Sequence, residues 1–435
     1  MIAINALNPS SSVLTTLVLC PFTDGVNTRC GKISLSCEAQ KLFRAVSTST
    51  RSRSRSAGSP ARDEVLARVP TGSGMPYAWS PTRAARYVRA AVRWARLLAP
   101  GPRKPGLRVF YGHDRVPAPG EPVAGGTAKF QRLAARFPNH PSDFTVLYLG
   151  STWLPRDLER LLRYSGRRGI PVVLNQNGVG YPGWAGDRME AFNQPLRRVL
   201  AEARHVLYQT QFCKRTADHF VREAAGSWEI LPNAVDVDRF TPGERTARNG
   251  GPVLLLGGDQ TQAYRLELGL RTLAALLSDH PDARLLVTGR LVVRAEPLIT
   301  AAGVEGHVDL VGRYAQTDAP SLYRRADLLL HTKVNDPCPS VVIEAMASGL
   351  PVVYPASGGT VELVGDEAGV GVPHDDGFDE DRPPAPDALA AAVTDVLAQR
   401  DRYAAAARER AVARFALTSW LDRHAALFAQ LVGQS

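Results

Sequence analysis

The stretch of sequence that decides the fold is DLLLH at residues 327–331, followed by NDPCPSVVIEAMASGLPVV at residues 335–353. It contains an apolar run, a turn with two prolines, a helical pattern that ends at Gly349, and a second apolar run. Proline suits the entrance of a helix, because the first N–H groups of a helix have no acceptor within it. The order of these segments predicts a strand, a helix over 340–348 and a second strand.

Short apolar runs alternate with helical patterns on both sides of this stretch, from residue 107 onward. Such alternation is typical of βαβ units that build a parallel sheet. In the first half we predict strands at 107–111, 144–149, 171–175, 205–208 and 228–231, with helices at 127–137, 155–167, 187–203 and 211–224. In the second half the predicted strands are 252–256, 284–288, 307–311, 327–331, 351–354 and 370–372, with helices at 265–279, 293–302, 318–325, 340–348 and 386–399.

The two halves are separated by residues 241–251, which are rich in proline, glycine and arginine. We therefore predict an α/β chain of two doubly wound, Rossmann-like domains at 107–245 and 246–415, with a helix at 416–435 that returns toward the N-terminal domain. Ligands of open α/β sheets gather outside the carboxyl ends of the strands, so a cleft between two such domains is the expected site. Two unrelated flavodoxin-like domains would show the same alternation.

The overall composition is that of an ordinary globular protein, since 44% of the 435 residues are hydrophobic and 22% are charged. It excludes a collagen-like chain, a disulfide-stapled chain and a chain that is disordered throughout. The net charge of +10 is concentrated in residues 1–105, which hold 16 Lys and Arg against 4 Asp and Glu, whereas the remainder holds 36 against 38. Clustered basic residues favour nucleic acid, but the two predicted domains carry no such surplus.

Residues 1–81 are expected to be disordered, because the STSTRSRSRS run at 47–56 and its surroundings offer little to bury. A start codon assigned too far upstream would also add such a segment, in which case Met75 is the natural first residue. The apolar run at 12–20 is too short to span a bilayer and lacks the basic flank of a signal peptide.

The five cysteines form no Cys-x-x-Cys pair and have no histidine at ligand spacing: they are Cys20, Cys30, Cys37, Cys213 and Cys338. We therefore expect neither a zinc site nor a disulfide framework, and the pattern fits a reducing cytoplasm. We expect Cys213 and Cys338 to be inert, and His113 and His331 to be packed or solvated.

Residues 82–98 read TRAARYVRAAVRWARLL, which predicts an amphipathic helix. One face takes Arg83, Arg86, Arg89, Arg93 and Arg96, the other takes Ala84, Val88, Ala91, Ala95 and Leu98, and Tyr87 and Trp94 lie between them. Such a helix can lie on an anionic membrane surface, or it can pack against a domain with its arginines in solvent. A linker at 99–106 follows it.

The turn before the helix at 340–348 predicts a site for an anion. The first amides of this helix, with the helix dipole, favour a phosphate near Pro339, Ser340 and Val341. Asp336 and Glu344 are carboxylates eight residues apart on either side of the helix start, where they could hold hydroxyl groups that flank a diphosphate. Alternatively, Glu344 could serve only the helix dipole and Asp336 only the turn.

These residues resemble glycosyltransferase family 4, the retaining nucleotide-sugar transferases of GT-B fold. Their mark is Glu-x7-Glu followed by Ala-Met-Ala/Cys-x-Gly-x-Pro-Val-Val, and this chain has Asp336-x7-Glu344 followed by AMASGLPVV at 345–353. The resemblance implies that Glu344 holds the nucleotide ribose and that Asp336 faces the donor sugar. Asp336 is one methylene shorter than the usual glutamate.

Other segments extend the resemblance over residues 107–432. PDARLLVTG at 281–289 is similar to the family's strand that places a glycine, here Gly289, near the nucleobase. ILPNAVD at 230–236 with Phe240 is similar to the interdomain hinge, and Ser357, Gly358 and Gly359 with Glu362 are similar to a loop whose amides approach the donor. Gly125 and Gly126 resemble the glycine loop that lines the phosphate and acceptor region.

The chain departs from the family where cations and a histidine are usual. The first strand of the second domain ends in Gly257, Gly258 and Asp259, without the usual Gly-Arg, and Arg265 stands where a lysine is expected. Arg265 is therefore the candidate for the diphosphate, with Arg290, Lys333 and Arg313 as possible substitutes. Asn177 stands where many members carry a histidine, and it could give only a neutral hydrogen bond.

The resemblance implies a retaining transfer that needs no metal and no cofactor, with a UDP- or GDP-linked sugar as donor and a glycan or lipid-linked acceptor. The protein's part is charge stabilisation and positioning. We expect a cytoplasmic enzyme of cell-surface polysaccharide or glycolipid synthesis, at the inner face of the plasma membrane if residues 82–98 bind anionic lipid, and no nucleic-acid partner. The alternatives are a nucleotide-sugar epimerase of GT-B fold, a catalytically impaired sugar-nucleotide-binding protein, and a nucleic-acid binder that uses only the basic tail.

Overall fold

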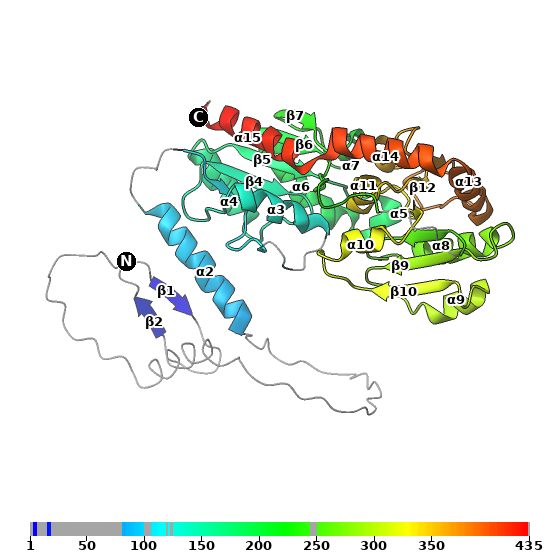
Figure 1. The fold of residues 1–435 in the computed structure, drawn as a ribbon. Helices are drawn as coiled ribbons and strands as arrows, with labels where there is room; N and C mark the ends of the chain where they lie inside the picture. The colour runs from blue at the N-terminus through cyan, green and yellow to red at the C-terminus, as the bar shows by residue number, and fades with distance from the viewer. Residues whose placement is uncertain are drawn as a thin grey trace, which may run out of the picture. The chain divides into compact units, whose positions relative to one another are not determined.

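The computed structural model describes residues 3–6, 15–18, 81–99, 106–118, 121, 125–243 and 250–433 (Figure 1). The chain divides into two units, Met1–Tyr77 and Ala78–Ser435. The first unit contains an antiparallel pair, β1 (Ala3–Ala6) and β2 (Thr15–Val18). The rest of the predicted disordered segment, with Met75, lies outside the described residues, as does most of the predicted linker at 99–106.

The second unit begins with α2 and contains both predicted α/β domains (Figure 1). The N-terminal domain has a parallel sheet of β3 (Val109–Phe110), β4 (Val146–Gly150), β5 (Val172–Gln176), β6 (His205–Tyr208) and β7 (Ser227–Ile230), in that spatial order. Its helices are α3 (Gly125–Arg136), α4 (Leu158–Arg167), α5 (Pro182–Ala185), η1 (Gly186–Arg188), α6 (Met189–Glu202) and α7 (Gln211–Phe220).

The two faces of this sheet are covered by different helices. On one face, Tyr148, Val173 and Leu207 pack against α3 and the C-terminal helix α15 (Leu417–Gly433). On the other face, Leu147 and Leu149 pack against α4, α6 and α7. Every connection leads to the next strand in the same direction across the sheet. Because α3 lies on the opposite face from α4, α6 and α7, the β3–α3–β4 crossover has the opposite hand to the other crossovers. Such crossovers nearly always share one hand. The exception brings α3 to the side of the sheet where α15 lies.

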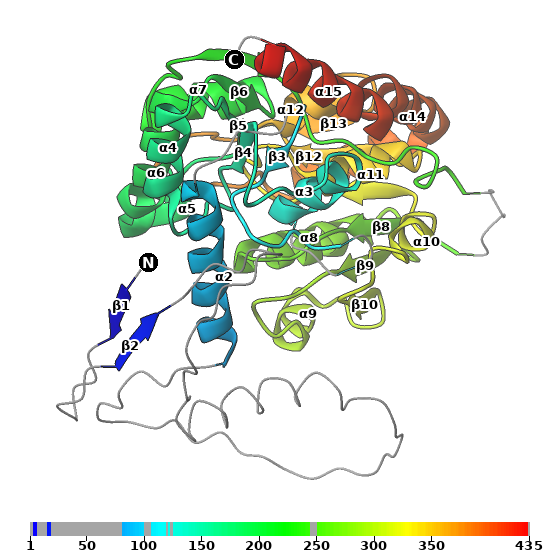
Figure 2. The same cartoon turned by 90° about the vertical axis from the view of Figure 1, so that its left-hand side faces the viewer.

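The C-terminal domain has a six-stranded parallel sheet in the order β10-β9-β8-β11-β12-β13. Figure 2 shows β8, β9 and β10 side by side in this sheet. The strands are β8 (Val253–Leu256), β9 (Arg284–Thr288), β10 (Val308–Gly312), β11 (Leu328–Leu330), β12 (Val352–Pro355) and β13 (Gly369–Val372). The helices are α8 (Ala263–Leu276), α9 (Glu296–Ala302), α10 (Ala319–Tyr323), α11 (Ser340–Ala347), α12 (Thr360–Val364), α13 (Pro386–Ala398) and α14 (Arg400–Phe415). The strand order reverses between β8 and β11, which is where doubly wound sheets bind ligands.

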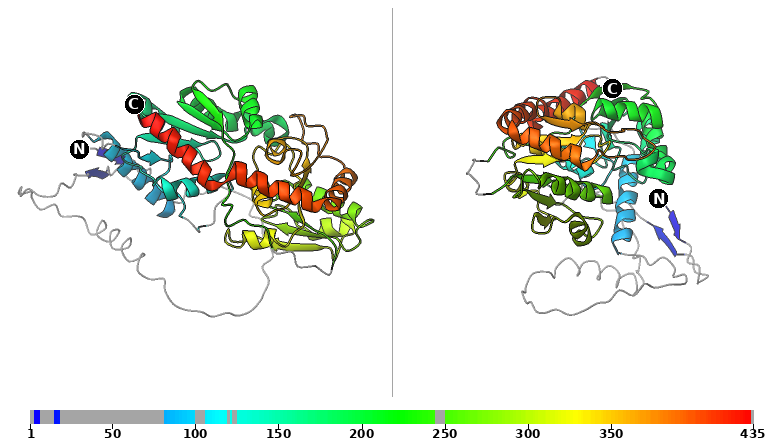
Figure 3. Two further views of the ribbon diagram at one scale, coloured as in Figure 1. Left: turned by 45° about the horizontal axis from the view of Figure 1, so that its top comes forward. Right: turned by 90° about the vertical axis from the view of Figure 1, so that its right-hand side faces the viewer.

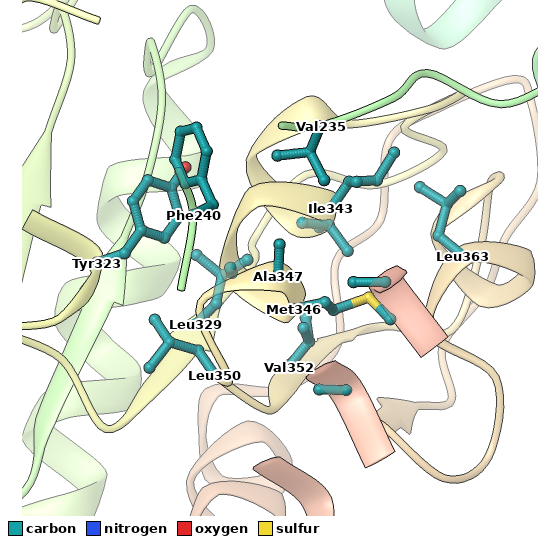
Figure 4. Packing of buried hydrophobic residues seen from close by; sticks show 14 of the residues in the cluster. Val235, Phe240, Tyr323, Leu329, Ile343, Met346, Ala347, Leu350, Val352 and Leu363 are labelled. Atoms are coloured by element: carbon teal, nitrogen blue, oxygen red, sulfur yellow. The ribbon is translucent and has the colours of Figure 1, made fainter. Parts of the chain in front are cut away.

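Apolar packing fixes α11 at this point of the sheet. Ile343 and Met346 are buried in one cluster with Leu329 of β11 and Val352 of β12 (Figure 4). Phe415 of α14 belongs to the same cluster. The stretch quoted at the outset therefore forms strand, turn, helix and strand, as predicted.

The chain passes between the domains twice, and the two passages are joined. The N–H of Val235 donates to the carbonyl of Phe415 at 2.8 Å, and the N–H of Leu417 donates to the carbonyl of Val235 at 2.9 Å. Helix α14 lies in the C-terminal domain and α15 lies on the N-terminal domain (Figure 3). His424 of α15 hydrogen-bonds with Tyr148 of β4. These crossing segments connect the two domains, and the first of them contains residues 230–236, the predicted hinge.

Helix α2 (Pro81–Leu98) packs against the N-terminal domain through a face that differs from the predicted apolar face. Arg93 is only 4% exposed and forms ion pairs with Asp114, at 2.7 Å, and with Asp157. The indole N–H of Trp94 also donates to Asp157, at 2.9 Å, while Leu98 is 60% exposed. The prediction of a solvated Arg93 opposite a packed Leu98 is wrong, because two acidic side chains of the domain provide partners for the arginine.

Candidate functional site

The turn before α11 is shaped by the loop that follows β12. Asn335 has a positive φ of 51°, and its N–H donates to Ser357 Oγ at 3.0 Å. The N–H of Gly359 donates to the carbonyl of Asp336 at 2.8 Å. A Cβ on Gly358 would lie 2.6 Å from the backbone N of Asp336, and Gly358 itself has a φ of +70°. Only glycine fits there, so the Gly358–Gly359 loop is held directly against the Asp336 turn.

Asp336 lies at the centre of a cluster of cationic and imidazole groups. Its Oδ1 is 3.2 Å from Lys333 Nζ, and its Oδ2 is 3.3 Å from His331 Nε2. Burial by itself would raise the pKa of Asp336, but Lys333, His331 and Arg265 outweigh burial and hold this pKa well below its usual range. Asp336 is therefore a carboxylate at any physiological pH. Burial lowers the pKa of His331 against the opposing effect of Asp336.

Arg265 contributes a buried cation beside Asp336. It lies in the first turn of α8, is 5% exposed, and its Nη1 donates to the carbonyl of Asp259 at 2.7 Å. Its Nε has no hydrogen-bond partner among the described residues. Burial lowers the pKa of Arg265, and Asp336 opposes that effect. A buried guanidinium with an N–H to spare suits an incoming anion.

The other candidate cations lie in different surroundings. Arg290 follows β9, is half-exposed, and pairs with Asp259 at 3.8 Å. Arg313 is exposed after β10. The structure thus brings Arg265 and Lys333 to Asp336, and it does not bring Arg290 or Arg313 there.

Glu344 lies one and a half turns into α11 and forms a second cluster. Its Oε2 accepts a hydrogen bond from the hydroxyl of Tyr323 at 2.9 Å, and its Oε1 lies 3.8 Å from Nη2 of Arg132 on α3. Burial raises the pKa of Glu344, and Arg132 opposes that effect. Tyr314, whose pKa burial raises to about 12, lies beside the same carboxylate.

Three of the predicted glycines bring backbone close to this region. Gly289 has a φ of +89°, and a Cβ there would lie 2.4 Å from the carbonyl oxygen of Gly258. A Cβ on Gly257 would lie 2.5 Å from Cγ2 of Val341 at the start of α11. The ends of β8 and β9 therefore meet backbone to backbone, and the backbone at Gly257 lies against the side chain of Val341 at the start of α11. Pro339 is the N-cap of α11 and makes no side-chain hydrogen bond to the turn that begins at Ser340.

The N-terminal domain reaches the same turn through the end of β5. A Cβ on Gly178 would lie 3.0 Å from Cγ of Pro337, so Asn177 is next to the contact between the domains. The N–H of Asn177 donates to Ser151 Oγ, and its Oδ1 accepts from the N–H of Gly178 at 2.7 Å. Gly125 and Gly126 begin α3, and a Cβ on Gly126 would lie 2.6 Å from Thr152 Oγ1.

A buried lysine that the sequence did not single out lies between these groups. Lys129 of α3 is 3% exposed, and its Nζ donates to Asn175 Oδ1 at 2.6 Å. Gln209 joins Asn175 to Asn233, which donates to the carbonyl of Cys338 at 3.0 Å. Burial lowers the pKa of Lys129 to about 8. A polar network thus connects α3 with the entrance of α11.

The site also contains Arg132, Tyr323 and His331, which sequence reasoning did not assign to it. His331 directly follows β11. Because ligands bind at the carboxyl ends of parallel strands, this position could have marked His331 as a site residue. Arg132 and Tyr323 meet Glu344 only through tertiary packing, and no motif marks them. Cys213 and Cys338 are buried thiols, and burial raises the pKa of Cys213 to about 12.

The arrangement combines two acceptor carboxylates with buried cations around one helix start. Asp336 and Glu344 can accept hydrogen bonds from hydroxyl groups, while Arg265, Lys333 and the first amides of α11 can stabilise a phosphate. Within the described ranges there is no group of three or more His, Cys, Asp and Glu side chains placed to hold a metal ion.

Comparison with known proteins points to one enzyme class. Residues 242–412 match the family model of glycosyl transferases group 1. A D-inositol 3-phosphate glycosyltransferase of Geodermatophilus obscurus is 32% identical over 256 residues, which cover 52% of this chain and 53% of the relative. A GDP-mannose-dependent alpha-(1-6)-phosphatidylinositol monomannoside mannosyltransferase of Mycolicibacterium smegmatis is 28% identical over 64% of this chain and 73% of its own length. The chain spans about half of the length of the first of these relatives.

Solved structures share the two-domain architecture. Sucrose-phosphate synthase from Thermosynechococcus elongatus superposes with a TM-score of 0.55 at 21% identity, over 70% of this chain and 77% of that one. Anabaena HepE in complex with UDP superposes with a TM-score of 0.52 at 19% identity, over 70% of this chain and 81% of that one. At these identities the likeness shows the fold. The chain therefore has the GT-B fold of two Rossmann-like domains, and its residues 242–412 match the group 1 glycosyltransferase family.

Proposed function

We propose that the protein is a retaining glycosyltransferase of the family 4 type, which moves a sugar from a nucleotide-sugar donor to a hydroxyl group of an acceptor. The observation that carries the proposal is the pair of buried carboxylates at α11, each with its own cationic partner. Asp336 lies with Lys333 and Arg265, and Glu344 lies with Arg132. The family match over residues 242–412 supports the same reaction class.

Each part of the donor has a counterpart among these residues. Glu344 accepts hydrogen bonds from the ribose hydroxyl groups. The backbone of Gly257, Gly258 and Gly289 borders the nucleobase. The diphosphate lies against Arg265 and Lys333, against the amides of Ser340 and Val341 after Pro339, and against the Gly358–Gly359 loop. Asp336 accepts hydrogen bonds from hydroxyl groups of the sugar, and Asn177 contacts the sugar from the N-terminal domain. Gly125 and Gly126 line the acceptor side of the phosphate.

The chemistry follows from what these groups can do. The acceptor oxygen bonds to the anomeric carbon on the face from which the nucleoside diphosphate leaves, and a phosphate oxygen of the leaving group takes the acceptor proton. Arg265 and Lys333 stabilise the negative charge that develops on the diphosphate, a contribution of several kcal/mol for preorganised donors. Asp336 and Glu344 hold the two ends of the donor, so that the reacting atoms are aligned.

The donor is a UDP- or GDP-linked sugar, and the acceptor is a glycan or a lipid-linked molecule. The Mycolicibacterium relative is named for GDP-mannose and a phosphatidylinositol mannoside, and HepE is solved with UDP. The described part of α2 exposes the apolar side chains Val92 and Leu98 as well as Arg89 and Arg96, a combination that suits contact with an anionic membrane surface. No helix within the described ranges is both long enough and apolar enough to cross a bilayer.

A product assay tests the reaction. The purified full chain is incubated with a panel of UDP- and GDP-sugars and with inositol phosphate or phosphatidylinositol mannoside as acceptor, and NMR gives the anomeric configuration of the product. We expect acceptor-dependent release of nucleoside diphosphate and a product with the donor's configuration. An inverted product contradicts retention. Isomerised donor without acceptor indicates an epimerase, and tight donor binding without release or transfer indicates a binding protein.

A further inference from the structure

The interface between the domains places a cation of the N-terminal domain beside the proposed ribose carboxylate. Nη1 of Arg132 donates to the carbonyl of Ala234 in the hinge, and Nη2 lies 3.8 Å from Oε1 of Glu344. The side chains of Arg132 and Glu344 are 16% and 15% exposed. The hydrogen bond to the hinge therefore fixes the guanidinium at a set distance from the carboxylate.

The distance between Nη2 of Arg132 and Oε1 of Glu344 is too long for a hydrogen bond. A charge-assisted hydrogen bond between an arginine and a carboxylate is about 2.7–2.9 Å long. At 3.8 Å, Arg132 acts on Glu344 through its electric field and leaves the lone pairs of Oε1 open to another donor. The other carboxylate oxygen accepts from Tyr323. Glu344 is thus oriented by two neighbours and can still accept a hydroxyl hydrogen bond.

The surroundings make the charge of Glu344 depend on Arg132. The groups that face the carboxylate are Tyr323 of α10, Tyr314 after β10, Arg132 of α3 and, farther away, Arg239 after the hinge. Both tyrosines are neutral at physiological pH, because burial raises their pKa values. Burial also favours the protonated form of Glu344, and Arg132 is the larger of the two opposing positive charges. A protonated carboxyl has fewer acceptor sites for a ribose diol.

We propose that Arg132 is a positioning residue, which holds the Glu344 carboxylate charged and aimed for the ribose. The proposal rests on the function given above, in which Glu344 binds the ribose. Because Arg132 belongs to the N-terminal domain, the proposed nucleotide site of the C-terminal domain is completed across the interface between the two domains. Helix α3, which contains Arg132, begins at Gly125 and Gly126, the residues proposed to line the acceptor side of the phosphate.

Calorimetric titration of the full chain with UDP and GDP, from about pH 5 to pH 8, tests this role. In the wild type, affinity falls as the pH falls and Glu344 takes up a proton. Arg132→Met raises the pKa of Glu344 further, so we expect the loss of affinity to begin at a higher pH than in the wild type, and the variant to bind severalfold more weakly than the wild type on the acidic side. Arg132→Lys keeps the charge and should keep most of the wild-type profile.

Two controls separate positioning from a structural role. Arg136→Met, one turn along α3, removes an exposed arginine that pairs with Asp422 and should leave the pH profile unchanged. With 2′,3′-dideoxy forms of UDP and GDP, which lack the ribose diol, wild type and Arg132→Met should have the same pH profile. The inference is overturned if the wild type binds UDP or GDP and Arg132→Met loses affinity at the same pH as the wild type. A wild type that binds neither nucleotide contradicts the proposed function itself.

Discussion

The carboxylate of Glu362 in the C-terminal domain accepts a hydrogen bond of 2.7 Å from the backbone N–H of Gln211 in the N-terminal domain. Its second oxygen accepts from the N–H of Phe212, also at 2.7 Å. Glu362 therefore caps α7 from across the interface, where the helix dipole favours a negative charge. Thr210, the N-cap of α7, donates from its hydroxyl to the carbonyl of Pro337 at 2.9 Å. The start of α7 is thus a contact between the domains beside the turn that contains Asp336 and Pro337.

The first prediction concerns this contact. Glu362→Ala removes both acceptors, and each hydrogen bond to a charged group contributes about 1.5–3 kcal/mol. We expect the domains to open, with a larger radius of gyration in X-ray scattering and weaker nucleotide binding. Glu367→Ala, an exposed neighbour, is the matched control and should leave both measurements unchanged. An unchanged radius of gyration in Glu362→Ala would mean that this cap does not hold the domains together.

A second prediction concerns Asp336. Asp336→Asn keeps the size of the side chain but removes the negative charge between Lys333, His331 and Arg265. We expect the turnover number for nucleoside diphosphate release to fall by about 100-fold or more, while nucleotide affinity changes less. The control is Asp309→Asn on β10, whose carboxylate pairs with Arg284 at 2.7 Å on the outer strand. Full turnover in Asp336→Asn would remove this residue from the mechanism.

A third prediction follows from the pKa of Lys129, which burial lowers from 10.5 to about 8. Between these values the unfolded chain binds more protons than the folded chain, so stability rises with pH in this window. The penalty for burying the charge is fully present below about pH 8 and is relieved toward pH 10.5. Its full size is about 3 kcal/mol, since one pKa unit corresponds to about 1.4 kcal/mol.

Denaturant unfolding at several pH values checks this account of Lys129. The difference in unfolding free energy between wild type and Lys129→Met should increase in favour of the wild type from about pH 8 to pH 10. Lys214→Met is the control, because Lys214 pairs with Asp218 near the surface. A difference that stays flat with pH would show that Lys129 keeps its ordinary pKa.

The glycine at the end of β9 supports a fourth prediction. Gly289→Ala combines a φ of +89° with a Cβ only 2.4 Å from the carbonyl oxygen of Gly258. We expect a loss of about 3 kcal/mol or more in unfolding free energy. Gly303→Ala is the matched control, because its φ is +67° and no atom lies within 4 Å of the added Cβ. That variant should lose only about 1–2 kcal/mol, and equal losses would exclude the close approach as the cause.

Much of the fold was predictable from local patterns. The strand at 284–288 was predicted with the bounds that β9 has, because a compact apolar run ends at a glycine. The strand predicted at 107–111 is reduced to Val109–Phe110 at the sheet edge. Helix α14 was not predicted, since its sequence is rich in alanine and arginine and only one side of it packs. The faces of α2 were wrong because periodicity does not reveal that Asp114 and Asp157 will hold Arg93.

Some residues of the candidate site were predictable from the sequence, and others were visible only in the structure. Asp336 and Glu344 follow from one nearly contiguous motif, and the candidate glycines follow from separate short segments that resemble the same family. The structure also brings Arg265 to Asp336. Arg132 and Lys129 come from a helix about two hundred residues earlier, and only the packing of the two domains against each other brings them toward α11. Sequence spacing contains no information about such contacts.

The most direct test of the central claim is thermal unfolding of the full chain with a panel of UDP- and GDP-sugars, in the wild type and in Glu344→Ala. A ligand at a hundredfold excess over its dissociation constant adds about 2.7 kcal/mol to stability. We predict that at least one nucleotide sugar raises the melting temperature of the wild type and that Glu344→Ala abolishes this shift while it retains the wild-type circular dichroism. No shift with any nucleotide sugar, or an equal shift in Glu344→Ala, would contradict the account.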